Sequence, residues 1–113
     1  MQRQFEQELN RIKQQVLTMA GLVEHVLDDV AKAIPTRDKA LAQKVIDFDD
    51  QIDQCEVEID RLATEFIVRQ QPMAVDLRFV IVAIKLGPEL ERIADNAVNI
   101  CLLYTSDSAD DRY

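Results

Sequence analysis

Residues 5–30 read FEQELNRIKQQVLTMAGLVEHVLDDV, and their apolar side chains recur at alternating steps of four and three. The positions that follow this rule are Phe5, Leu9, Ile12, Val16, Met19, Val23, Val26 and Val30. This spacing places all of them on one face of an α-helix in heptad register. Because proline disfavours helical conformation at the residue before it, Pro35 should end this helix, and we expect it to span residues 4–34.

The same spacing returns after Pro35, at Leu41, Val45, Phe48, Ile52, Cys55, Ile59, Leu62 and Phe66. It predicts a second helix over residues 37–70, with the Thr36 side chain as its N-cap. Two apolar seams of equal length joined by a short turn predict an antiparallel helical hairpin.

A third helix is expected over residues 73–100, because Pro72 suits the first turn of a helix, where its missing amide would be unpaired anyway. Apolar residues surround this helix, which is typical of burial on more than one side. Pro88 should remove the backbone bond to Ile84 and bend the helix one turn before Glu91. The predicted fold class is therefore all-α, an antiparallel three-helix bundle over residues 1–100.

The segment 101–113 differs from the rest, because the small and acidic run after Tyr104 has no apolar seam. Its start, Cys-Leu-Leu-Tyr-Thr-Ser-Asp, resembles a translated sequencing adapter. We therefore expect residues 101–113 to be a non-native or disordered tail and leave them out of functional reasoning.

The composition limits the function classes. The chain has 113 residues and a formal net charge of -8, and no basic patch interleaves with aromatic residues, which argues against direct nucleic-acid binding. Cys55 and Cys101 are far apart and no secretory leader is visible, so we expect a reduced, cytoplasmic setting. No apolar run reaches the roughly 20 residues of a membrane-spanning helix.

Acidic side chains follow the seam of the second helix and recur on the third. These candidate ligands are Asp49, Asp53, Glu56 and Asp60 on the second helix, and Glu91, Asp95 and Asn99 on the third. Like charges one helical turn apart repel unless a cation, a basic side chain or water compensates. Oxygen ligands of this kind suit iron, manganese, magnesium or calcium, so the pattern predicts a metal site between the two helices.

Spacing alone leaves other interpretations open. Acidic residues at helical spacing usually form a solvated face, and Arg61 and Arg92 could neutralise the acidic rows as salt bridges. His25 is more often a surface residue than a ligand in such a setting. No nucleophile with its base, no phosphate-binding glycine loop and no Glu-x-x-His pair is visible, which favours a non-enzymatic protein. A metal-dependent carboxylate-bundle enzyme and a plain helical dimerisation module remain alternatives.

Two segments carry a family resemblance: residues 69–78, RQQPMAVDLR, and residues 89–95, ELERIAD. With the landmarks VLTMAG at 16–21 and EVEID at 56–60, they resemble the PhoU family of phosphate-signalling proteins along residues 1–100. Ala94 stands where the family usually has glycine.

The resemblance implies a three-helix bundle that normally occurs as two tandem copies, of which this chain holds the first. It implies a negative regulator of phosphate signalling and uptake that acts as an adaptor between the phosphate transporter ATPase and a membrane sensor histidine kinase. Because the second copy is missing, the apolar sides of the third helix should be uncovered, and we expect this chain to form a homodimer or to aggregate. The resemblance also implies a metal ion cluster, with iron favoured and manganese, zinc or magnesium as alternatives. The family's Glu/Asp-x-x-x-Asp motifs map onto Glu56 with Asp60 and onto Glu91 with Asp95.

Overall fold

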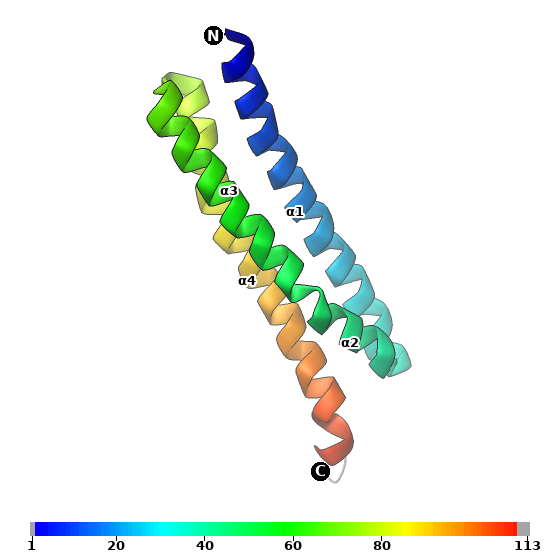
Figure 1. Cartoon of the computed structure of the whole chain (residues 1–113). Helices are drawn as coiled ribbons and strands as arrows, with labels where there is room; N and C mark the ends of the chain where they lie inside the picture. Colours follow the sequence, from blue (N-terminus) through cyan, green and yellow to red (C-terminus); the bar gives the residue numbers. More distant parts are fainter. Residues whose placement is uncertain (1, 111–113) are drawn as a thin grey trace.

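Three long helical rods run side by side in the computed structural model, which describes residues 2–110 (Figure 1). Helix α1 (Gln2–Thr36) is the first rod, α2 (Lys39–Asp47) and α3 (Asp49–Gln70) together form the second, and α4 (Ala74–Asp110) is the third. Successive rods point in opposite directions, and the bundle measures 63 × 19 × 19 Å. The predicted all-α three-helix bundle is thus confirmed.

The apolar seams form the core. The buried hydrophobic side chains are Leu9, Ile12, Met19, Val23, Val26, Val30, Ala33, Ala42, Val45, Ile52, Ile59, Leu62, Ala63, Phe66, Val80, Ala83, Ala94, Ala97 and Cys101. All three rods contribute, and small residues dominate where α4 enters the core. Because alanine lets helix backbones approach closely, α4 can pack against α1 and α3 together.

The second rod is interrupted at Phe48, which the sequence pattern did not indicate. The Phe48 amide donates to the carbonyls of Lys44 and Val45 at 3.0 and 3.2 Å, and its own carbonyl accepts from the Gln51 amide at 3.1 Å. Its half-buried side chain packs on the core. Asp49 and Asp50 occupy the first turn of α3, where the positive end of the helix dipole favours negative charge.

The connection between α1 and α2 corrects the predicted cap. Thr36 still belongs to α1, and its hydroxyl donates back to the Lys32 carbonyl at 2.6 Å. Arg37 takes the left-handed conformation (φ 54°), and the Asp38 amide bonds to the Ala33 carbonyl, as in a Schellman ending. The Asp38 carboxylate then accepts from the Leu41 amide at 3.0 Å and caps α2. The prediction for Thr36 was wrong because the helix runs one residue past Pro35.

Helix α4 also extends beyond its predicted end at residue 100. It continues through Pro88 and on to Asp110, because no further proline or glycine follows to stop it, and Cys101 is fully buried. The division of the chain at residue 100 stays a prediction, and residues 111–113 lie outside the described part. Within residues 2–110, no helix combines the length and apolarity that crossing a membrane requires.

Candidate metal centre

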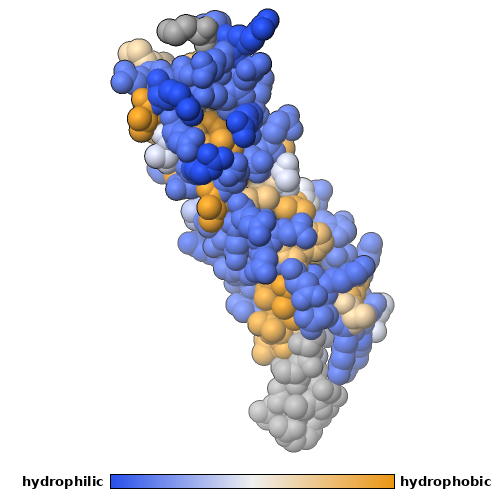
Figure 2. All heavy atoms as spheres, in the orientation of Figure 1, coloured by the Kyte–Doolittle hydropathy of each residue, from blue (hydrophilic) through white to orange (hydrophobic). Residues whose placement is uncertain are grey.

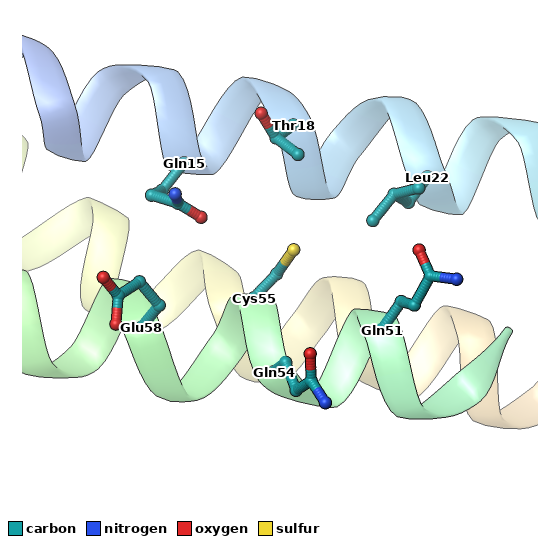
Figure 3. A pocket seen from close by; sticks show the side chains of 7 residues that line it. All are labelled: Gln15, Thr18, Leu22, Gln51, Gln54, Cys55 and Glu58. Carbon is teal, nitrogen blue, oxygen red and sulfur yellow. The ribbon is translucent and has the colours of Figure 1, made fainter.

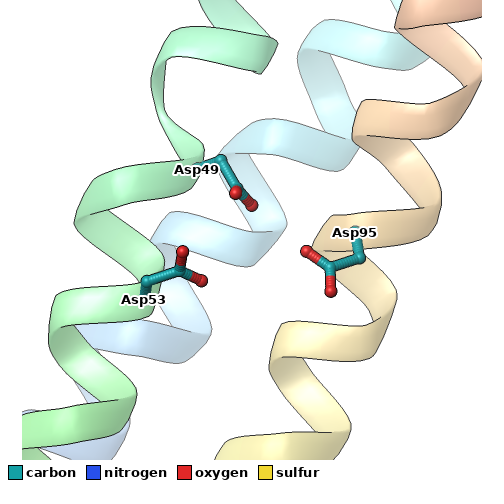
Figure 4. Close-up of side chains that lie close together, drawn as sticks. All are labelled: Asp49, Asp53 and Asp95. Carbon is teal, nitrogen blue, oxygen red and sulfur yellow. The ribbon is translucent and has the colours of Figure 1, made fainter.

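Three aspartates from two helices converge on one another near the middle of the bundle. Asp49 and Asp53 lie one turn apart on α3, and Asp95 faces them from α4 (Figure 4). Each offers one carboxylate oxygen, and these oxygens all lie within 4.8 Å of one another. Asp49 and Asp53 lie beside the apolar seam of α3, so the packing that buries this seam turns both side chains towards α4.

One oxygen of the Asp49 carboxylate has no hydrogen-bond partner. Asp49 is half-buried, and this oxygen, Oδ1, is itself buried. Burial raises the pKa of Asp49 above its usual range, and the negative charges of Asp53 and Asp95 raise it further. An orphaned, buried carboxylate oxygen beside two others is an arrangement that a cation would satisfy.

Two glutamates extend this group of carboxylates. Glu56 lies one helical turn after Asp53 on α3, and Glu91 lies one turn before Asp95 on α4. Burial raises the pKa of Glu91 to about 8, and hydrogen bonding to Asp53 and Glu56 adds to the effect. Folding therefore favours the protonated form of this carboxyl beside its acidic neighbours. We use the name acidic cluster for Asp49, Asp53, Glu56, Glu91 and Asp95.

Gly87 makes room for the Glu56 side chain. It is buried on α4, and a Cβ atom built there would stand 3.3 Å from Glu56 Cγ. The absence of a side chain at residue 87 lets Glu56 lie directly against α4. The donor set is all oxygen and partly buried, and together with the orphaned Asp49 atom it fits a hard or borderline cation.

The two remaining predicted ligands are placed differently. Asp60 is exposed one turn beyond Glu56 on α3, and the three aspartates that converge do not include it. Asn99 is exposed one turn beyond Asp95 on α4. Both stay predictions as ligands.

The arginines that could have neutralised the acidic cluster bind other residues. Arg61 pairs with Glu58 at 2.7 Å and with Glu65 at 3.1 Å along the outer face of α3. Arg92 pairs with Glu89 at 3.3 Å on α4. Among the described residues, therefore, no arginine or lysine forms an ion pair with the acidic cluster.

His25 takes part in a separate contact. Its Nε2 atom lies 3.3 Å from the buried Asp29 carboxylate, and its ring meets Phe48 edge-on, with centroids 5.6 Å apart. It therefore braces the joint between α2 and α3. The sequence signal for this role was weak, because it depends on Phe48 interrupting the second rod.

An open groove of about 470 Å³ lies between α1 and α3, away from the three aspartates (Figure 3). Its lining residues are Gln15, Thr18, Leu22, Gln51, Gln54, Cys55 and Glu58. The Cys55 sulfur points towards α1, and burial raises the pKa of this thiol. The groove therefore places a thiol with a raised pKa among amide side chains, and its lining includes no residue of the acidic cluster.

The fold and the cluster together define a class, an all-α three-rod bundle with a partly buried carboxylate group between two of its rods. Residues 16–103 match the PhoU domain, and the chain belongs to this family. The resemblance carried by residues 69–78 and 89–95 is thereby confirmed.

Curated relatives agree with this assignment. The chain is 46% identical over 98 residues to the phosphate-specific transport system accessory protein PhoU of Serratia marcescens, a match that covers 87% of this chain and 40% of the relative. It is 45% identical over 98 residues to the Escherichia coli protein of that name, covering 87% and 41%. It is 41% identical over 97 residues to the Pseudomonas aeruginosa homolog, covering 86% and 40%. The chain thus spans about two fifths of the length of these relatives.

Proposed function

We propose that this chain is the metal-binding bundle of a negative regulator of phosphate signalling and phosphate uptake. The relatives are named as accessory proteins of the phosphate-specific transport system, which supports a regulatory rather than an enzymatic role. The whole protein would act in the cytoplasm as an adaptor between the transporter ATPase and the sensor histidine kinase. Such an adaptor acts by binding one conformation of its partner more tightly than another.

The observation that carries the metal proposal is the convergence of Asp49, Asp53 and Asp95 around an orphaned buried oxygen. Asp49, Asp53, Glu56, Glu91 and Asp95 would hold the cation, which is iron in our proposal, with manganese, zinc or magnesium as alternatives. A bound cation would supply the positive charge that the acidic cluster lacks and would thereby fix α3 to α4.

Elemental analysis with calorimetric titration of iron, manganese, zinc and magnesium tests this proposal. We expect Asp53→Asn with Asp95→Asn to abolish binding, because both change converging ligands. Glu89→Gln is the control, because it changes an exposed carboxylate of α4 that pairs with Arg92 outside the acidic cluster, and it should bind as the unchanged chain does. Absence of bound metal in the unchanged chain, or equal binding by the double variant, would refute the metal site.

The regulatory role has a separate test. Deletion of the gene for the full-length protein in its host should raise phosphate-responsive expression and uptake when phosphate is plentiful. Complementation with the Asp53→Asn, Asp95→Asn gene then tells whether regulation requires the metal ligands. Unchanged expression and uptake in the deletion strain would reject the regulatory proposal whatever the metal content.

We also propose that the chain forms a homodimer through α4. Val82, Ile93 and Ile100 remain 58%, 42% and 40% exposed, and with the half-buried Leu86 they follow one line along the helix. Steps of four and seven keep these side chains within one narrow stripe. Contiguous apolar stripes of this kind are usually covered, and a second copy offers the same stripe for pairing.

A further inference from the structure

The connection between α3 and α4 exposes an unusual amount of apolar surface. Met73, Val75 and Val68 are 79%, 76% and 72% exposed, and they are the three most exposed large hydrophobic residues in the described chain. All three lie within a few residues of the turn at residues 71–73, at one end of the bundle (Figure 1). We call Val68, Met73 and Val75 the apical patch.

The turn that carries the apical patch is anchored to the bundle. Pro72 is buried, while Gln71 and Ala74 on either side have left-handed backbones with φ of 46° and 51°. The side-chain amide of Gln70 donates a hydrogen bond to the Glu8 carboxylate of α1 at 3.1 Å. Met73 is therefore held outward by a fixed turn, and its exposure does not come from a loose end.

Charge is distributed unevenly along the bundle, and the apical patch lies at the less acidic end. Contacts between Phe5 and Phe66 and between Lys13 and Phe79 show that residues 1–13 lie beside residues 61–79 at this end. These two segments contain six of the 13 basic residues and four of the 21 acidic ones. The rest of the chain then holds seven basic and seventeen acidic residues. Figure 2 shows apolar side chains set among polar ones at this end.

We propose that the apical patch docks on an anionic lipid surface. Exposed apolar side chains with unpaired basic residues at the same end of a protein can bind at the boundary between lipid headgroups and acyl chains, because the anionic headgroups attract the basic residues. Arg3 and Arg78 form no ion pair with any described residue, so both are available for headgroup phosphates. The strongly acidic remainder of the 63 Å bundle would be repelled by the same surface, so the bundle stands on its end.

This docking goes beyond the proposed regulatory function and does not depend on a bound metal. An acidic protein surface is the alternative partner, because its negative charge would also attract the basic residues at this end. The lipid surface is favoured because Val68 of α3, Met73 of the turn and Val75 of α4 lie at one end of the bundle, where a shallow insertion would cover them together.

Co-sedimentation with vesicles tests the proposal directly. The chain should bind vesicles that mix phosphatidylglycerol with phosphatidylcholine, and should not bind phosphatidylcholine vesicles. Binding should be lost at about 1 M salt, where the Debye length is about 3 Å. Met73→Ser with Val75→Ser should weaken binding at least roughly tenfold, because two inserted side chains lose their apolar contact.

Leu17→Ser with Val57→Ser is the matched control, because these residues are 63% and 65% exposed away from the turn. The control should bind mixed vesicles as the unchanged chain does, and circular dichroism should show equal helix content in both double variants. Absence of binding to the mixed vesicles, equal binding to both vesicle types, or an equal loss in the control would overturn the proposal.

Fluorescence gives a second readout, because the chain contains no tryptophan. Met73→Trp should shift its emission to the blue when mixed vesicles are added, whereas Val57→Trp should not change. Binding to soluble polyglutamate without a blue shift on vesicles would assign the apical patch to an acidic protein partner and reject the lipid surface.

Discussion

Gly87 of α4 and Glu56 of α3 are in such close contact that a Cβ atom at residue 87 would stand 3.3 Å from Glu56 Cγ. At that distance the glutamate side chain has to move by a few tenths of an ångström to accept even one methyl group. The shape of the acidic cluster thus depends on a residue that contributes no ligand.

Gly87→Ala should therefore weaken metal binding and leave the stability of the fold nearly unchanged. Alanine favours the helix by about 0.5–1 kcal/mol relative to glycine, which would offset most of the steric cost. We expect a nearly unchanged midpoint of thermal unfolding and a several-fold weaker metal affinity in calorimetry. Gly21→Ala is the control, because a Cβ at exposed residue 21 meets nothing within 4 Å. It should stabilise the chain and leave metal affinity unchanged. Equal affinities in the two variants would contradict the positioning role of Gly87.

The metal-free chain should lose stability as the pH rises from about 4.5 to about 8. In the unfolded chain Glu91 has the ordinary glutamate pKa of 4.5, and folding raises this pKa to about 8, so the folded state binds more protons between these values. Stability falls with pH wherever the folded state binds more protons than the unfolded state. Because solvent reaches this half-buried group, the loss should be on the order of 1 kcal/mol.

Glu91→Gln should flatten this pH dependence, because an amide neither ionises nor repels Asp53 and Glu56. Urea unfolding at pH 5 and pH 8 measures the difference. Glu89→Gln, on the exposed face of the same helix, should keep the slope of the unchanged chain. If the free energy of unfolding of Glu91→Gln depends on pH as strongly as that of the unchanged chain, a group other than Glu91 is responsible.

The corrected helix cap predicts unequal effects at two neighbouring residues. Asp38→Ala removes the acceptor of the Leu41 amide and should lower the free energy of unfolding by about 1 kcal/mol. Thr36→Ala removes only a hydroxyl that bonds back within α1, so its cost should be smaller. Denaturant unfolding of both variants decides the point, and a larger cost at Thr36 would favour the threonine as the cap.

The exposed stripe of α4 predicts self-association of the chain. Ile93→Glu should shift sedimentation from dimer to monomer, because it places a charge within a paired apolar face. Val57→Glu, at a more exposed position on α3, should leave the dimer intact. A monomer at high concentration for the unchanged chain would argue against the dimer.

The apolar spacing and the prolines of the sequence predicted much of the fold. The seams from Phe5 to Val30 and from Leu41 to Phe66 follow the helical repeat, and Pro35 and Pro72 lie near the turns. The interruption at Phe48 was not predictable, because no proline or glycine marks it and the apolar spacing runs through it. The Phe48 ring packs edge-on against His25 of α1, a contact that exists only once the second rod lies against α1.

The sequence by itself determined three amphipathic rods, their order, and acidic rows beside two of the seams, because each depends on residue type and on the helical repeat. Only the tertiary structure decided which acidic side chains meet. Asp49, Asp53 and Asp95 converge while Asp60 lies outside this group, since the relative rotation of α3 and α4 follows from core packing. Close approach at Gly87 and the burial of one Asp49 oxygen are likewise properties of two helices in contact, and no single segment encodes them.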